Sequence, residues 1–324
     1  MKAIVQTGYG PPDILRLEEV DTPVPGDDEV LVRVLASSVN FGNLAMVRGE
    51  PFVARFWSGL RQPKDPIPGS DIAGRVEAVG RSVTRFQPGD EVYGDLSECG
   101  FGAYAQYAAA PEAALAPKPA SLSFEEAAAV PQAALVALQG LRDKGRIKAG
   151  DRVLINGASG GNGTFAVQIA KALGAEVTGV CGPRNLELVR SLGADRVIDY
   201  TRDDFTRGGQ QYDLIFATAG YHSIFDYRRA LSPTGIYVSA GGEMKQVFQG
   251  MLLGPLASLG SGKTLTYLYQ RPSQSDLLAM NDLLESGRVK PVIDRVFPLA
   301  QTAEALRYYG EGHTTGKVAI TVQH

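Results

Sequence analysis

The sequence predicts an α/β protein in which a doubly wound parallel-sheet domain interrupts a domain of irregular β structure. Three observations lead to this fold class. Short β-branched strands alternate with helices through the centre of the chain, which is typical of a parallel sheet with helices on both faces. Strands and turns dominate the N-terminal part, and short strands return near the C-terminal end. At 324 residues the chain is long for one hydrophobic core, so two domains are expected.

The domain of irregular β structure combines segments from both ends of the chain. Alternating or β-branched runs, bounded by turns rich in Pro, Gly and Asp, predict strands at 2–6, 29–40, 74–80, 90–94, 292–299 and 317–322. A helix is predicted over 273–287, after Pro272. We therefore assign residues 1–122 and 272–324 to one discontinuous domain.

The inserted domain is assigned to residues 123–271. It opens at Ser123, which stands three residues before Glu126 in the spacing of a capping box, ahead of an Ala-rich helix. Strands are then predicted at 152–157, 176–181, 196–200, 212–220, 235–242 and 263–269. The helices between them are predicted at 162–173, 184–192, 223–231 and 244–253.

A glycine-rich loop lies between the first of these strands and its helix. Its pattern, Ala158-x-Gly160-x-x-Gly163, matches the dinucleotide fingerprint, with Ala at the first glycine position. Gly160 would let the backbone approach a pyrophosphate, and Gly163 would let the helix pack closely on the strand. Free N–H groups and the helix dipole would then hold the phosphates. The residues expected to bind the cofactor here are Ser159, Gly160, Gly161 and Asn162.

The end of the second strand decides between NADH and NADPH. NAD sites usually carry Asp or Glu there, to bind the ribose 2′-hydroxyl. This strand ends in Val180, Cys181 and Gly182, and Arg184 follows. A guanidinium at that place fits the 2′-phosphate of NADPH, with which it forms bidentate bonds. The alternative is a solvated arginine that opens the next helix. NADPH is the expected cofactor.

Four segments resemble the medium-chain dehydrogenase/reductase superfamily. They are the glycine loop with its helix and the second strand, LGADRVIDY at 192–200, PGSDIAGRVEAVG at 68–80 and GKVAITV at 316–322. Within this superfamily the chain is most similar to the zinc-free quinone oxidoreductase, or zeta-crystallin-like, branch. The resemblance implies a GroES-like catalytic domain, a Rossmann domain, an active-site cleft between them and a homodimer that pairs strand 263–269 across a twofold axis. Asn162 replaces the valine usual in this branch; its amide would bind the pyrophosphate or cap the helix.

Zinc-dependent relatives carry Cys, His-Glu and Cys ligands at positions that match Asn40, Ser70 with Asp71, and Gln132. Thiolate and imidazole are missing at all of these positions, and amides and hydroxyls are poor zinc ligands. The resemblance therefore implies no metal. It also places the candidate catalytic residues in this region: Asn40, Asn43 and Asp71, with Ser70 as a further polar candidate.

Asn40 is expected to lie beside both the nicotinamide and the substrate. Asn43 replaces the usual Asp and Val136 replaces a common Thr, so solvent is the expected source of the proton. For each polar candidate the alternative is a structural hydrogen bond in a loop. Further cofactor contacts implied by the resemblance, or by position at strand ends, are Cys181, Tyr200, Ala219 and Gly241.

The expected function is hydride transfer from NADPH to an activated acceptor, a quinone or an α,β-unsaturated carbonyl. One rival is a trans-acting enoyl reductase of polyketide or lipid synthesis. Another is a crystallin-like protein that binds NADPH without turnover. A net charge of −3 with scattered Lys and Arg predicts no nucleic acid or membrane partner. Two cysteines and an N-terminus without signal features favour a cytoplasmic location.

Overall fold

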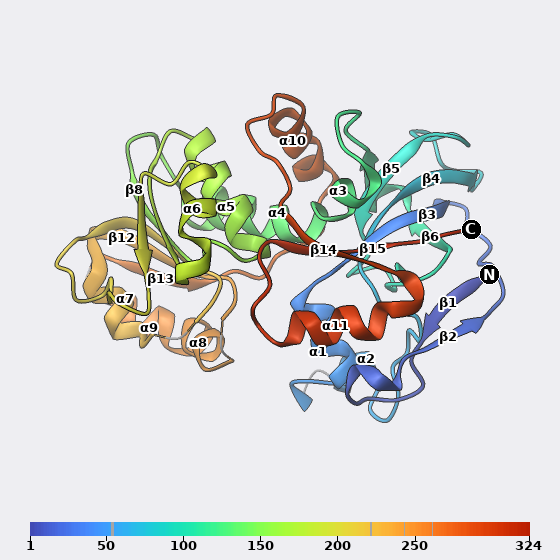
Figure 1. Ribbon diagram of the computed structural model, residues 1–324, viewed down its shortest axis with the longest axis horizontal. Helices are drawn as coiled ribbons and strands as arrows, with labels where there is room; N and C mark the ends of the chain where they lie inside the picture. Colours follow the sequence, from blue (N-terminus) through green and yellow to red (C-terminus); the bar gives the residue numbers. More distant parts are fainter. Residues whose placement is uncertain (53–54, 221, 243, 261) are drawn as a thin grey trace. The chain divides into compact units, whose positions relative to one another are not determined.

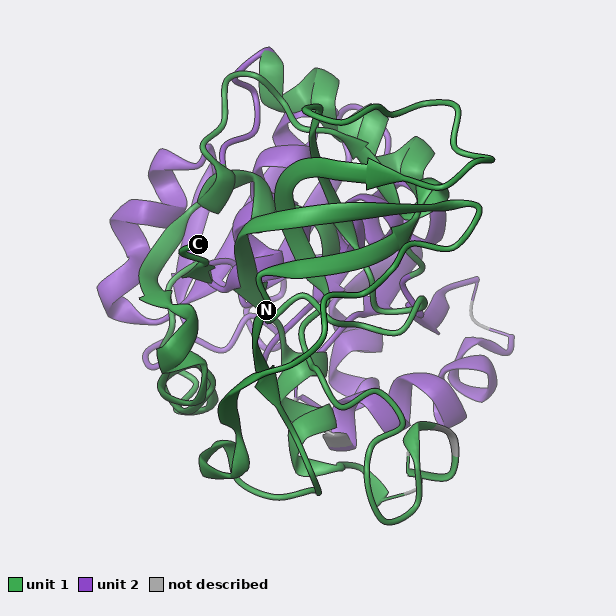
Figure 2. Ribbon diagram, turned by 90° about the vertical axis from the view of Figure 1, so that its right-hand side faces the viewer, with its two compact units in different colours: residues 1–132, 271–285, 291–324 green, residues 133–270, 286–290 purple. Residues whose placement is uncertain are grey.

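The computed structural model describes residues 1–52, 55–220, 222–242, 244–260 and 262–324 (Figure 1). The chain divides into two compact units, coloured separately in Figure 2. Unit 1 comprises residues 1–132, 271–285 and 291–324, and unit 2 comprises residues 133–270 and 286–290. The division after residue 132 differs from the expected one after 122, because helix α3 (Phe124–Ala128) packs on strands of unit 1.

Unit 1 is built on a seven-stranded sheet in the order β14-β15-β3-β4-β5-β7, with β6 also paired to β3. Its strands are β3 (Glu29–Val39), β4 (Asp71–Val79), β5 (Glu91–Asp95), β6 (Tyr107–Pro111), β7 (Leu115–Pro117), β14 (Ile293–Pro298) and β15 (Lys317–Thr321). The neighbours are antiparallel except β14 and β15. A separate hairpin-like pair joins β1 (Lys2–Val5) to β2 (Arg16–Glu19).

Short helices complete unit 1: α1 (Phe41–Arg48), α2 (Arg55–Ser58), α3, α10 (Gln274–Glu285) and α11 (Thr302–Gly310). The capping box predicted before α3 is confirmed: Ser123 Oγ accepts from the Glu126 N–H over 3.2 Å, and Glu126 Oε2 accepts from the Ser123 N–H over 2.9 Å. The Ala-rich segment expected to be helical after Ser123 forms two helices. It breaks before Pro131, where α4 (Pro131–Gln139) begins, because proline cannot continue the hydrogen-bond ladder.

Unit 2 contains the doubly wound sheet that the sequence predicts. Six parallel strands lie in the order β10-β9-β8-β11-β12-β13. Their bounds are β8 (Arg152–Asn156), β9 (Glu176–Cys181), β10 (Arg196–Asp199), β11 (Tyr212–Ala217), β12 (Leu231–Ser239) and β13 (Thr264–Tyr267). The strand order reverses at β8, between β9 and β11. In such sheets ligands bind beyond the carboxyl ends of the strands at this switch point.

Residues 133–139 of α4 belong to unit 2. The further α-helices of this unit are α5 (Gly161–Ala172), α6 (Leu186–Ser191), α7 (Ile224–Ala230), α8 (Met244–Phe248) and α9 (Gly254–Ser258) (Figure 1). The helix predicted from residue 184 starts later, because Pro183–Asn185 forms a 3₁₀ turn before α6. Across the described parts of both units, no helix combines the length and the apolar character needed to cross a bilayer.

Candidate functional site

The loop after β8 owes its shape to the missing side chain at Gly163. A Cβ there would lie 2.0 Å from the carbonyl oxygen of Gly157 and 2.8 Å from backbone atoms of Ala158. Close-packed interiors do not accommodate so short a contact, so only glycine lets the first turn of α5 lie against this loop. Gly157 itself has φ +89°, a conformation that also favours glycine.

Gly160 needs a different explanation. Its φ of −80° is open to any residue, and the nearest atom to a Cβ placed there would be the Gly157 carbonyl oxygen at 3.6 Å. Neither the backbone conformation nor a neighbouring protein atom therefore requires glycine at this position. The space beside Gly160 remains open, as it must be for a bound pyrophosphate to approach the backbone.

The N-terminus of α5 is free of side-chain capping. Gly160 occupies the N-cap position, and the first bond into the helix runs from the Thr164 N–H to the Gly160 carbonyl over 2.9 Å. The N–H groups of Gly161, Asn162 and Gly163 precede that bond, and such groups at a helix start form an anion site. The prediction that Asn162 caps the helix is wrong, because α5 begins one residue earlier than expected. A bond from its amide to a pyrophosphate stays a prediction.

Arg184 stands in a turn that is fastened to the glycine loop. Asn185 Nδ2 donates to Ser159 Oγ over 3.1 Å, which holds the Pro183–Asn185 turn beside the loop. Arg184 is exposed, and within the described ranges no side chain or carbonyl bonds its guanidinium. Its charge is therefore available to an anion that comes to this edge of the sheet.

A carboxylate also lies at this edge. Asp199 ends β10 and pairs in register with Cys181 at the end of β9. Its Oδ1 accepts from the backbone N–H of Thr201 over 2.9 Å and from the Thr201 hydroxyl over 2.8 Å. A carboxylate held by its own turn and a free guanidinium are thus both present where the adenosine ribose is expected.

The predicted contacts Cys181 and Tyr200 lie near each other. Cys181 is buried, and burial together with the charge of Asp199 raises the pKa of its thiol to about 11, so the thiol stays neutral and acts as a packing group. Tyr200 is 64% exposed, and its ring lies 3.5 Å from the place where a Gly182 side chain would begin. It is an exposed aromatic surface next to the turn that carries Arg184.

Ala219 and Gly241 follow β11 and β12 at the same edge. A Cβ at Gly157 would meet the Ala219 side chain at 2.5 Å, so Ala219 lies against the glycine loop. A Cβ at Gly241 would lie 2.7 Å from the carbonyl oxygen of Thr218. The structure therefore brings both positions to the carboxyl ends of the strands around the switch point.

The predicted residues of unit 1 form one buried polar network. Asn40 Nδ2 donates to Asp71 Oδ2 over 2.8 Å and to Ser70 Oγ over 3.3 Å. Asn43 Nδ2 donates to the same serine oxygen over 3.2 Å, and Asn43 Oδ1 accepts from the Asn40 N–H over 3.0 Å. Asn40 stands directly before α1 and Asp71 begins β4, so a helix start and a strand start meet here.

Lys317 enters this network at the start of β15. Its side chain is 3% exposed, and its ammonium lies 3.5 Å from Asp71 Oδ2. The ammonium also donates to Asn40 Oδ1 and to the Val39 carbonyl, the latter over 3.2 Å. Burial lowers the pKa of Lys317, while the charge of Asp71 acts in the opposite direction. Lys317 and Asp71 therefore form a buried ion pair inside unit 1.

The network is closed. Both ends of the Asn40 amide are engaged, and Asp71 further accepts from the Ser38 hydroxyl over 2.7 Å and from the Gln132 N–H over 3.1 Å. The positions that match zinc ligands in the resemblance are thus joined around a lysine ammonium. Among the described residues, no group of three or more His, Cys, Asp or Glu side chains could hold a metal ion.

Sequence reasoning missed Lys317 and Asn185. Lys317 lies in the GKVAITV segment, where a lysine that starts a buried strand is an available signal, but only the folded chain shows that Asp71 is its partner. Asn185 follows Arg184 directly, and its bond to Ser159 depends on the 3₁₀ turn that the sequence did not predict.

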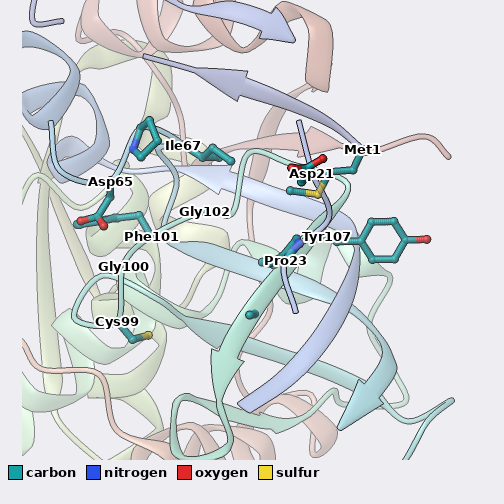
Figure 3. A pocket seen from close by; sticks show the side chains of 13 residues that line it. Met1, Asp21, Pro23, Asp65, Ile67, Cys99, Gly100, Phe101, Gly102 and Tyr107 are labelled. Carbon is teal, nitrogen blue, oxygen red and sulfur yellow. The ribbon is translucent and has the colours of Figure 1, made fainter. Parts of the chain in front are cut away.

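A pocket of about 250 Å³ lies in unit 1 apart from these residues (Figure 3). Met1, Asp65, Cys99 and Phe101 are among the residues that line it, and none of the predicted site residues does. Burial and nearby carboxylates, Asp95 above all, raise the pKa of Cys99 to about 12, so its thiol is not a nucleophile at neutral pH.

Comparisons with known proteins agree with this geometry. Residues 26–120 match the family model described as alcohol dehydrogenase GroES-like domain, and residues 192–320 match the one described as zinc-binding dehydrogenase. The chain is 35% identical over 337 residues to a chloroplastic quinone-oxidoreductase homolog of Spinacia oleracea, covering 99% of this chain and 98% of that protein. It is 32% identical over 332 residues to a chloroplastic NADPH-dependent alkenal/one oxidoreductase of Arabidopsis thaliana, covering 99% and 79%.

Two further similarities bear on the reaction. A trans-enoyl reductase of Aspergillus terreus is 32% identical over 318 residues, covering 92% of this chain and 87% of that protein. The solved structure of the quinone oxidoreductase from Coxiella burnetii superposes with a TM-score of 0.89 at 28% identity, covering 100% of this chain and 99% of that one.

Two glycine substitutions should separate binding from folding. Gly160→Ala adds a methyl group to open space, so we expect an unchanged melting temperature and a rise of about tenfold or more in the Kd for NADPH. Gly163→Ala forces a methyl group onto the Gly157 carbonyl, so we expect a loss of about 1–3 kcal/mol in unfolding free energy. Calorimetric titration and urea unfolding measure the two effects. Equal NADPH affinity in Gly160→Ala and the wild type would contradict the assignment of the loop.

Lys317→Met should destabilise unit 1 strongly. The substitution leaves the carboxylate of Asp71 buried without its cation, which costs about 3–5 kcal/mol of unfolding free energy. Adding Asp71→Asn removes the stranded charge, so the double variant should recover part of the loss. Urea unfolding of the wild type, the single and the double variant measures this coupling. A single variant as stable as the wild type would show that the pair is not formed.

Proposed function

Because this chain belongs to the medium-chain dehydrogenase/reductase superfamily, in its zinc-free quinone oxidoreductase branch, we propose that it is an NADPH-dependent reductase of quinones and α,β-unsaturated carbonyls. One observation carries the proposal: the uncapped start of α5 beside the open face of Gly160, at the switch point of a parallel sheet. A dinucleotide diphosphate is the ligand whose charge and shape fit this arrangement.

We propose that the N–H groups of Gly161 and Asn162 hold the diphosphate and that Arg184 binds the 2′-phosphate of NADPH. The bond between Asn185 and Ser159 supports the second assignment, because it holds the arginine turn beside the loop. Asp199 would repel a phosphate, but it is held by Thr201, whereas the guanidinium has no bond to the described residues. When bound, NADPH supplies the hydride.

The chemistry of the polar network supports the proposed substrate class. In unit 1 the ammonium of Lys317 already stands beside Asp71, so a second cation at this carboxylate would meet like charge. A site whose side chains do not suit a Lewis-acidic metal ion fits acceptors that are already activated, such as a quinone or a conjugated carbonyl. Asn40 would bond the acceptor only by giving up a present partner, so we propose that the network mainly orients α1 and that solvent supplies the proton.

Two alternatives remain as proposals. The similarity to a trans-enoyl reductase favours a trans-acting enoyl reductase of polyketide or lipid synthesis, which would use the same cofactor site on a thioester. The closed network around Asn40 favours a crystallin-like protein that binds NADPH without turnover. Both share the glycine-loop site and differ in what happens after NADPH binds.

We also propose a homodimer. Strand β13 forms one edge of the unit 2 sheet. Residues 249–259, which pack beside β13, present several apolar side chains. Those that are more than 40% exposed are Met251, Leu252, Leu253, Leu256 and Leu259. An unpaired strand edge next to an exposed apolar patch is typical of an association surface. A second copy related by a twofold axis would cover it.

Initial rates of NADPH oxidation test the proposed function. We expect turnover of crotonaldehyde, 1,4-benzoquinone and 9,10-phenanthrenequinone, and little turnover of a crotonyl thioester. Preference for the thioester would favour the enoyl reductase. Tight NADPH binding without turnover of any acceptor would favour the binding protein, and absence of NADPH binding would contradict all three.

The 2′-phosphate assignment is tested by Arg184→Ala. Losing a charge-assisted bond should raise the Kd for NADPH about tenfold or more and leave the Kd for NADH within about twofold. Arg190→Ala is the matched control, because Arg190 is also exposed and pairs with Glu187. Fluorescence titration of both variants with NADPH and NADH gives four Kd values, each compared with that of the wild type. The assignment fails if Arg184→Ala weakens NADH and NADPH equally.

The dimer is tested by light scattering after size exclusion. The wild type should have twice the 34.5 kDa chain mass. Leu256→Glu with Leu259→Glu puts charge into the apolar patch and should give the monomer mass, since buried unpaired carboxylates oppose association. A wild type that elutes as a monomer at micromolar concentration would rule out this interface.

A further inference from the structure

A relay of hydrogen bonds crosses the carboxyl edge of the unit 2 sheet through a buried phenol. Asn156, the last residue of β8, donates from Nδ2 to the Ala219 carbonyl over 3.1 Å and to the Tyr227 hydroxyl over 3.0 Å. Tyr227 is fully buried on α7 and donates in turn to Gln246 Oε1 over 2.6 Å. Gln246 Nε2 completes the relay by donating to the Gly241 carbonyl over 2.9 Å.

Each donor and acceptor in this relay has one consistent role. The Asn156 and Gln246 amides donate from nitrogen, and the phenol accepts from one and donates to the other. Burial raises the pKa of Tyr227 well above its usual value, so the hydroxyl keeps its proton. A fully satisfied buried network of this kind holds its members in one arrangement.

The position of Gln246 in the relay leaves no room for a side chain at residue 242. A Cβ at that position would lie 2.5 Å from Gln246 Nε2, and its φ of +96° favours glycine. The chain after β12 therefore passes directly over the glutamine amide. Stacking reinforces the position of the phenol, because the Tyr237 ring lies 4.2 Å from the Tyr227 ring, centroid to centroid.

The segments that the relay joins are those of the proposed cofactor site. Asn156 directly precedes the glycine loop, and Ala219 and Gly241 follow β11 and β12. Arg184 lies on the β9 side of the switch point, where the adenosine half of NADPH is proposed to bind. With the diphosphate at α5, the nicotinamide half must extend to the other side, over the ends of β11 and β12.

We propose that Tyr227 is a positioning residue for the nicotinamide half of the dinucleotide. Its hydroxyl fixes the loops after β8, β11 and β12 relative to one another and so shapes the floor on which the nicotinamide ribose lies. The inference rests on the proposed cofactor site, and it concerns only one half of the ligand. A role in core packing alone would depend on the ring of Tyr227 and not on its hydroxyl.

Tyr227→Phe tests this directly, because the ring remains and only the hydroxyl is removed. The Gln246 carbonyl then lacks its donor, and one Asn156 hydrogen lacks its acceptor. We expect the Kd for NADPH to rise about five- to tenfold. The Kd for 2′,5′-ADP, which carries only the adenosine half, should stay within about twofold.

Tyr212→Phe is the matched control. Tyr212 is as buried as Tyr227, but it begins strand β11 and so lies at the opposite end of the sheet from the relay. It should change the Kd of neither ligand by more than about twofold, even if its melting temperature falls as much as that of Tyr227→Phe. Gln246→Met interrupts the relay from its other side and should reproduce the pattern of Tyr227→Phe, which keeps the test available if the tyrosine variant does not fold.

Equal weakening of NADPH and 2′,5′-ADP in Tyr227→Phe, or no change in either, would overturn the proposal. So would the same NADPH loss in Tyr212→Phe. A wild type that binds neither ligand would instead overturn the cofactor site itself. The two failures are therefore distinguishable.

Discussion

The contact between Gly163 and the Gly157 carbonyl determines the geometry of unit 2 at its switch point. Because no Cβ separates them, α5 starts against the loop that follows β8, and its start has no capping side chain. The bond between Asn185 and Ser159 and the approach of Ala219 to Gly157 both depend on that position of the loop. The close contact at Gly163 thus fixes where α5 begins relative to the loop, and the proposed diphosphate site depends on that position.

Unit 1 depends on a different constraint, which is the burial of an ion pair. Lys317 and Asp71 are excluded from water, so their charges must be matched by each other and by the amides and hydroxyls around them. Those partners include the positions that match zinc ligands in the family resemblance. In this chain the carboxylate among them already has an internal cation, the ammonium of Lys317.

The sequence predicts those parts of the structure that local pattern determines. Alternating strands and helices predict the parallel sheet, the Ser123–Glu126 spacing predicts the capping box, and the fingerprint predicts the tight contact at Gly163. Parts that depend on distant segments were not predicted. Lys317 meets Asp71 only because β15 and β4 both flank β3. Tyr227 meets Gln246 only because the fold brings the start of α8 within hydrogen-bond distance of α7. The start of α5 at Gly161 rather than Asn162 shows that element boundaries follow packing as much as propensity.

A crystal structure of the chain soaked or grown with NADPH measures the central claim most directly. The account predicts diphosphate oxygens within hydrogen-bond distance of the N–H groups of Gly161 and Asn162, with the 2′-phosphate on the guanidinium of Arg184. A nucleotide bound away from the start of α5, or a 2′-phosphate turned to solvent with Arg184 unengaged, would contradict it.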